Sequence, residues 1–271
     1  MLKRLIKYDM RAISKIAVPM FISSGTISLL CCAVLYFTFG FANDLNSVFK
    51  AFMITGGLYL VGVLTIVVML AIVLFTIIAR YYRSVFSDEG YLNMVIPVTR
   101  RNFLDSKIIS SVLWFVMTSF VAWGCVIISL ILPTLLYDTS LVSVAFEAIR
   151  LEMGIENENV LFGITALILK LFLALVNTVK DVMLIITAVT LGATLMKRLK
   201  ISGSVLLYFI IGFSEELFVD AASFLLRWVT VDHAWLSLIF DSVFEFFVSV
   251  VIYIIGYVVT LYVLEKRLNL E

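Results

Sequence analysis

Long apolar runs alternate with short polar connectors along the whole chain. Six of the runs reach the roughly 20 residues that a helix needs to cross a bilayer. They lie at 16–39, 51–79, 108–132, 162–196, 201–229 and 235–264. No internal repeat or low-complexity linker separates them. The pattern predicts an all-α polytopic membrane protein with six transmembrane helices in a single domain over 1–271.

The longest interruption in this pattern is the polar stretch 80–107, which reads RYYRSVFSDEGYLNMVIPVTRRNFLDSK. Gly90 and Pro97 stop a single helix from running through it. Its middle, the 88–98 segment, presents apolar and aromatic side chains to water between charged flanks. Such a surface is typical of a docking site for another protein. A cytosolic loop that folds back on its own helix ends would have the same composition, and both interpretations stay open.

Residues 2–15 precede the first span and have the pattern of a basic amphipathic helix. The apolar face consists of Leu2, Ile6, Met10 and Ile13, and the polar face of Lys3, Lys7, Arg11 and Ser14. We expect this helix to lie in the headgroup layer of an anionic leaflet, as an elbow into the first span. The alternative is a plain positive flank that only sets the topology.

Composition and charge placement agree with a membrane protein. Of the 271 residues, 63% are hydrophobic and 14% are charged. With six spans both termini lie on one side, and most of the 20 basic residues fall there. They are the five before the first span, five within 80–107, Lys197, Arg198, Lys200, Lys266 and Arg267. The positive-inside rule therefore predicts that both termini and the 80–107 loop are cytoplasmic.

The last three predicted spans contain charged residues, which are costly in hydrocarbon and raise a functional question. They are Lys170, Lys180, Asp181, Glu215, Glu216, Asp220, Asp241 and Glu245. An antiparallel hairpin of spans four and five places Lys180 level with about Leu217, next to Glu216 and about 25 Å from the cytoplasmic end. We expect Lys180 to pair with Glu216 or Glu215. The cluster of Lys180, Asp181, Glu215, Glu216 and Asp220 is either self-neutralising or lines an outward pathway for cationic or amphipathic cargo.

Enzymatic chemistry finds little support in the sequence. Glu215 and Glu216 are similar to the paired glutamates of intramembrane CAAX-type proteases, but Asp220 stands where that pattern needs Arg. The chain has one histidine, His233, and its three cysteines lie within apolar runs as small core residues. Neither a metal site nor a Ser/His dyad can be assembled from these residues. There is no GxxxxGK[ST] loop for nucleotide phosphates. We expect no catalytic residues, no metal and no nucleic-acid partner.

Three segments carry a resemblance to a known family. The loop RYYRSVFSDEGYLNMVIPVTRRNFLDSKIIS resembles the YRSLF-x-DEGYL and LPVSRRQ stretch of the small six-span permease subunits of type-2 ABC exporters, a class common in Firmicutes. LGATLMKRLKISGSVLLYF looks like their turn between spans four and five, and YVVTLYVLEKRLNLE resembles their C-terminal ending. Together the segments cover about a quarter of the chain. The acidic fifth span departs from that family, where mostly neutral residues stand.

The resemblance implies a transport subunit of a bacterial plasma membrane. It would work with separate ATPase subunits, which bind ATP and Mg²⁺, and with a second permease, identical or related. The 80–107 loop would hold a coupling helix that docks on the ATPase. The residues that match this docking motif, or would fill the groove of the ATPase, are Asp88, Glu89, Gly90, Tyr91, Leu92, Met94, Pro97, Arg100 and Arg101. Thr99 is placed to cap the helix that follows.

An alternative from another class is a gradient-driven carrier that needs no ATPase. In that case Lys180, Asp181 and Glu216 would form an ion relay. Neither interpretation identifies the cargo.

Overall fold

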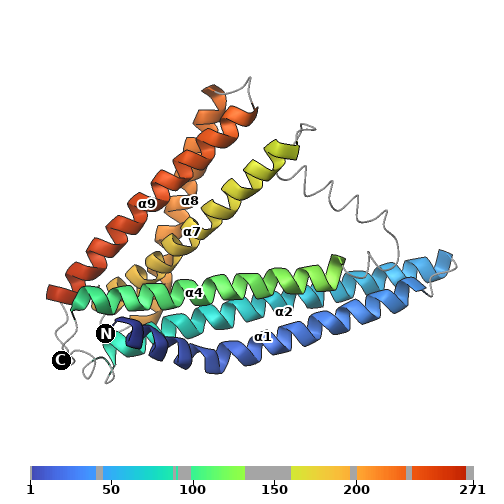
Figure 1. The fold of residues 1–271 in the computed structure, drawn as a ribbon, viewed down its shortest axis with the longest axis horizontal. Helices are drawn as coiled ribbons and strands as arrows, with labels where there is room; N and C mark the ends of the chain where they lie inside the picture. The colour runs from blue at the N-terminus through green and yellow to red at the C-terminus, as the bar shows by residue number, and fades with distance from the viewer. Residues whose placement is uncertain are drawn as a thin grey trace. The chain divides into compact units, whose positions relative to one another are not determined.

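The computed structural model describes residues 2–40, 45–87, 90, 99–131, 160–195, 200–229 and 234–266. These residues form long helices, with no strand among them. The helices are α1 (Leu2–Gly40), α2 (Leu45–Phe86), α4 (Arg100–Val126, continued by the short π-helix η1, Ile127–Ile131), α7 (Val160–Leu195), α8 (Lys200–Val229) and α9 (Ala234–Lys266) (Figure 1). The predicted all-α class is confirmed. The 88–98 segment lies, except for Gly90, outside the described residues.

Five of these helices are long and apolar enough over their described residues to cross a membrane. The stretches are Leu2–Val34, Leu60–Phe86, Arg100–Ser129, Ile168–Leu195 and Asp241–Lys266. The predicted fifth span, 201–229, coincides with α8 but is not among them. Glu215, Glu216 and Asp220 fall close together in α8 and interrupt its apolar run. A polytopic membrane protein is therefore supported, and the sixth span stays a prediction.

The expected elbow at 2–15 is not confirmed as a separate element. α1 runs without interruption from Leu2 to Gly40 and contains Pro19. Pro19 has no N–H to donate to the Lys15 carbonyl, and membrane helices tolerate such a loss where neighbouring groups satisfy the freed carbonyl. Residues 16–18 contain neither glycine nor proline, so the basic helix continues directly into the span.

The chain divides into two compact units that share helices. One unit comprises Met1–Met10, Ile77–Leu113 and Ile168–Glu271, and the other Arg11–Thr76 and Trp114–Leu167. α1, α2 and α4 contribute residues to both, whereas α8 and α9 belong to the first alone. We refer to them as the charged unit and the apolar unit, because most charged groups described below lie in the first.

α7 is the central helix of the charged unit. Its residues 182–190 are all buried, without the exposed stripe that a peripheral helix shows. Tyr81 of α2 shares a hydrogen bond of 2.7 Å with Thr190 Oγ1 of α7. Thr260 Oγ1 of α9 donates to Thr187 Oγ1 of α7 at 3.2 Å. Interhelical bonds of this kind hold helices in register where hydrocarbon supplies no hydrophobic driving force.

Small residues let the helices of the charged unit approach closely. A Cβ on Gly256 of α9 would lie 2.8 Å from Thr187 Oγ1 and 3.3 Å from Met183 Cγ, both on α7. A Cβ on Gly192 of α7 would lie 2.6 Å from the backbone nitrogen of Ser204 on α8. Glycine at these two positions therefore sets the spacing of α9 and α8 against α7.

The apolar unit contains α1 from Arg11 onward, α2 up to Thr76, α4 from Trp114 onward and the first turns of α7. Ser24 Oγ of α1 lies 3.1 Å from Met69 Sδ of α2, and the Phe21 and Trp114 rings pack with centroids 6.1 Å apart. Cys125 donates to Ser24 Oγ at 3.8 Å. Cys31, Cys32 and Cys125 are all buried and free of disulfides. The prediction that they are small core residues is confirmed.

Candidate functional site

Both ends of the 88–98 segment have defined structures. Gly90 is buried, and its N–H donates to the Ser87 carbonyl at 2.7 Å. A Cβ there would lie 2.7 Å from the carbonyl carbon of Val85, so the chain can pass this close only with glycine. Ser87 Oγ also donates to the carbonyl of Arg83 in the last turn of α2. Gly90 is therefore held against the last turn of α2.

At the other end, Thr99 caps α4 as the sequence predicts. Its Oγ1 accepts from the Asn102 N–H at 3.4 Å, and its carbonyl accepts from the Phe103 N–H at 3.1 Å. A threonine in this position satisfies donors that have no partner inside the helix. Arg100 is half-buried and Arg101 is exposed, both in the first turn. The other predicted docking residues, Asp88, Glu89, Tyr91, Leu92, Met94 and Pro97, lie outside the described residues.

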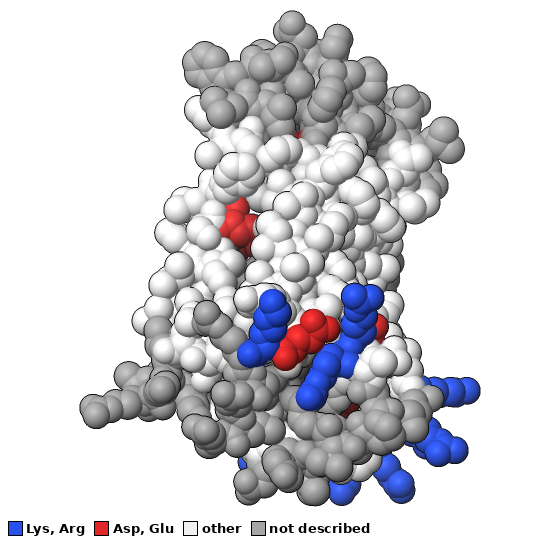
Figure 2. All heavy atoms as spheres, turned by 90° about the vertical axis from the view of Figure 1, so that its left-hand side faces the viewer, with Lys and Arg blue, Asp and Glu red and all other residues white. Residues whose placement is uncertain are grey.

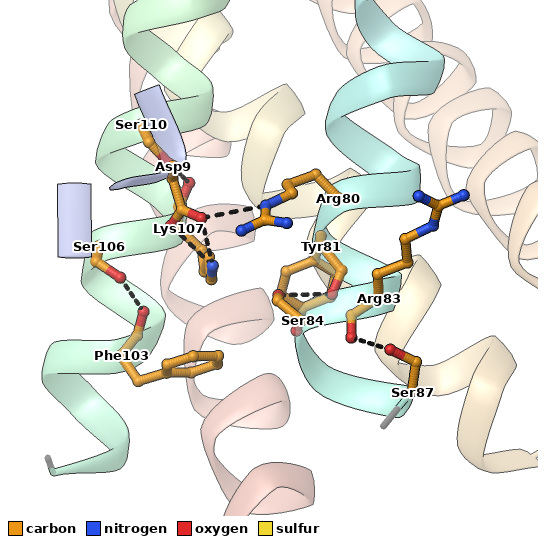
Figure 3. Close-up of polar contacts among 10 residues, drawn as sticks. All are labelled: Asp9, Arg80, Tyr81, Arg83, Ser84, Ser87, Phe103, Ser106, Lys107 and Ser110. Atoms are coloured by element: carbon orange, nitrogen blue, oxygen red, sulfur yellow. Dashed lines mark hydrogen bonds and ion pairs between the residues drawn. The ribbon is translucent and has the colours of Figure 1, made fainter. Parts of the chain in front are cut away.

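A cluster of buried charges joins these two ends to the start of α1. Lys107 Nζ of α4 donates to both carboxylate oxygens of Asp9, at 2.8 and 2.7 Å (Figure 3). Arg80 Nε of α2 lies 3.4 Å from Asp9 Oδ1. The side chains of Asp9, Lys107 and Arg80 are 2%, 8% and 18% exposed. We call these residues the Asp9 cluster.

One aromatic ring lies close to each cation of the Asp9 cluster. The Arg80 guanidinium carbon lies 5.1 Å from the centroid of the Tyr8 ring, and Lys107 Nζ lies 5.2 Å from that of Phe103. Both distances suit cation–π attraction. In Figure 3 the side chains of Asp9, Arg80 and Lys107 point toward one another from three different helices. The cluster lies at the end of the charged unit where basic groups concentrate.

Surface charge follows the same arrangement. Figure 2 shows blue Lys and Arg side chains gathered near the lower end of one face, with red acidic groups between them. In the charged unit the exposed basic residues that the structure describes are Lys3, Arg4, Lys7, Arg83, Arg101, Lys266 and, within the predicted span of α7, Lys170. All but Lys170 lie near the ends of their helices, and such an accumulation at helix ends is typical of the cytoplasmic side of a membrane protein.

A second polar cluster lies inside the predicted span of α7. Lys180 donates to Glu215 Oε1 of α8, and its Nζ is also 3.4 Å from Asp181 Oδ1. The side chains of Lys180 and Glu215 are 13% and 9% exposed, whereas that of Asp181 is 49% exposed. The expected pairing across the hairpin therefore occurs, and Glu215 is the partner.

The remaining predicted members of this cluster do not join it. Glu216 and Asp220 are exposed on α8, although Glu216 neighbours Glu215 in sequence. Successive residues of a helix point about 100° apart, so only one of the two glutamates can face α7. The structure thus brings together Lys180, Asp181 and Glu215.

The sequence did not reveal a hydrogen-bonded chain between α7 and α9. Asn177 Nδ2 donates to Glu245 Oε1 at 2.6 Å, and Ser249 Oγ donates to Asn177 Oδ1 at 2.8 Å. Glu245 therefore has an amide partner one turn before Lys180. The signal that could have found it is the spacing of Asn177 and Lys180, which lie on one face of α7.

The Asp9 cluster was also missed. Asp9 is the one acidic residue among positions 1–43 and lies between Ile6 and Ile13 on the apolar face of the helix. An acid at such a position needs a basic partner when the face is buried. In the sequence, Arg80 and Lys107 are explained equally well as topology signals, and nothing pairs them with Asp9.

No protein-family model matches the chain, and no curated protein or solved structure matches it either. The resemblance to permease subunits therefore stays a prediction that rests on the residues quoted above.

Proposed function

We propose that this protein is the membrane-spanning permease subunit of an ATP-driven exporter. Separate P-loop ATPase subunits would dock on the 88–98 segment and supply the energy. The permease would alternate between cytoplasmic and outer access, as a dimer with a second copy or a related subunit. The proposed location is a bacterial plasma membrane, with both termini cytoplasmic.

The observation that carries this proposal is the way both ends of the 88–98 segment are held. Gly90 lies against the Val85 backbone at one end, and Thr99 caps α4 at the other. These attachments would pass a force on the segment to α2 and α4, although a loop that folds back on its own helix ends would have the same contacts. The five candidate spans and the docking-motif residues favour the same conclusion.

Co-purification with a soluble ATPase tests the proposal. The tagged wild-type protein, expressed with the ATPase reading frame beside its gene, should retain that P-loop subunit in detergent. Tyr91→Asp or Glu89→Arg should abolish retention, because the first removes an apolar anchor and the second reverses a charge in the proposed interface. Glu265→Arg is the matched control, since it reverses an exposed acid at the end of α9.

Retention of the ATPase by the control and by neither loop variant supports the proposal. Loss by the wild type, or equal retention by all variants, contradicts it. Abundance and monodispersity of each variant exclude trivial unfolding.

The gradient-driven carrier is the second candidate, and one contact favours it. Lys180 bridges a buried Glu215 and a half-exposed Asp181, as a relay between an enclosed and an accessible group would. Glu216, the third member of the expected relay, is exposed on α8 and does not bond to Lys180 in the described contacts. A carrier would transport in liposomes without any ATPase and would depend on pH or sodium.

A further inference from the structure

The Asp9 cluster joins three helix ends that are far apart in sequence. Asp9 lies in the first turns of α1, Arg80 eight residues before the 88–98 segment, and Lys107 eight residues after Thr99. At about 1.5 Å per residue, Arg80 lies about 9 Å from the end of α2 at Phe86, and Lys107 about 10 Å from the start of α4 at Arg100. One carboxylate therefore contacts both flanking helices, at a similar distance from the segment.

The physical character of the cluster makes it a stiff link. A carboxylate that accepts two bonds from a buried ammonium is held by short, charge-assisted hydrogen bonds. Breaking a buried pair by removing one partner is far more costly than breaking an exposed one. Apolar contacts between helices in a bilayer are weaker constraints, because lipid tails compete for the same surfaces. Among the described contacts of the first ten residues, the bonds of Asp9 are thus the strongest.

We infer that Asp9 is a positioning residue that ties the first turns of α1 to both ends of the 88–98 segment, so that a load on the segment moves the three helix ends as one body. The inference deepens the proposed function and rests on it, because the load is the push of the docked ATPase.

Spin-label distances test the link directly. Labels are placed at the exposed positions Lys3 of α1, Arg83 of α2 and Arg101 of α4, in a background whose buried native cysteines are replaced by serine. The protein is studied in nanodiscs by pulsed electron resonance. The wild type should give a narrow 3–101 distance distribution. Asp9→Asn should broaden it about twofold or more, because the charge that attracts Lys107 is lost. The 83–101 distribution should stay unchanged.

Further variants separate positioning from folding. Asp9→Glu keeps the charge and should keep the narrow 3–101 distribution. Asp9→Leu with Lys107→Met replaces the pair by apolar groups of similar volume, which should fold but give the broad distribution. A general folding defect would instead broaden both distance pairs and lower the yield.

The same labels in the assembled complex test the transmission of load. With the co-purifying ATPase present, ATP and vanadate should leave the wild-type 3–101 distance unchanged, because all three ends move together. In Asp9→Asn the 3–101 distance should shift on the same addition. A 3–101 distribution in Asp9→Asn as narrow as that of the wild type overturns the inference. Failure of the wild type to retain any ATPase overturns the proposed function instead, so the two failures are distinguishable.

Discussion

Replacing Lys180 by methionine tests how much the ion pair of Lys180 with Glu215, between α7 and α8, contributes to the free energy of unfolding. Methionine keeps most of the volume of the side chain but removes the ammonium, which leaves Glu215 at 9% exposure without its cation. Removing one partner of a buried ion pair costs about 3–5 kcal/mol. The side chain of Asp181 is 49% exposed, so the loss of its contact with Lys180 should add less than about 1 kcal/mol. We expect a loss at the lower end of this range, about 3 kcal/mol, because the contact is partly and not fully buried.

The assay is reversible unfolding in mixed micelles with increasing SDS, followed by tryptophan fluorescence. The double variant Lys180→Met with Glu215→Leu should recover to within about 1 kcal/mol of the wild type, since a buried pair and an apolar replacement are often equivalent. Lys170→Met is the matched control, because this lysine is exposed on the same helix. The reasoning is refuted if the double variant loses as much as the two single variants together, since unpaired residues show additive losses.

Four further changes test other parts of the chain. Thr99→Ala should cost about 1 kcal/mol through loss of the cap on α4, measured by the same SDS titration. Gly256→Ala should cost about 1–3 kcal/mol, because its Cβ would meet Thr187 at 2.8 Å. Gly212→Ala should be neutral or slightly stabilising, because nothing lies within 4 Å of its Cβ. A cysteine at Asn93 should react with an impermeant maleimide only in opened cells, and labelling of intact cells would contradict the cytoplasmic position of the loop.

Helix positions followed from the sequence because apolar run length fixes them. α9 begins at Ala234 and ends at Lys266, against a predicted span of 235–264. The cap at Thr99 could be predicted for the same reason, since it depends only on neighbours in sequence. The sequence could not decide between two adjacent candidate partners, because that choice depends on how a helix is rotated about its axis. Lys180 bonds to Glu215 rather than to Glu216, and only packing against α7 decides which of two adjacent residues faces inward.

Contacts between helices that are distant in sequence could not be predicted from the sequence for a different reason. The turn between α7 and α8 sets the register of their hairpin. A partner for Lys180 could therefore be found by counting residues from that turn. No such turn relates α1 to α4, or α7 to α9. Asp9 with Lys107 and Asn177 with Glu245 therefore became visible only in the folded chain. The separate elbow helix at 2–15 is not confirmed for a similar reason, because amphipathic spacing does not reveal whether a helix ends before the span begins.

The two kinds of charge in the predicted spans call for different explanations. Lys180, Glu215 and Glu245 have partners within the chain, so their presence in an apolar helix needs no transported ion. Glu216 and Asp220 are exposed on α8. If α8 crosses the bilayer, exposed carboxylates there must meet water or another subunit, since hydrocarbon would not tolerate them. The exposed pair, rather than Lys180, is thus the better candidate for a cargo pathway. Glu216→Gln should then change transport per folded molecule, whereas Lys180→Met should change only the amount of folded protein. Equal transport per folded molecule in both variants would assign all these charges to structure.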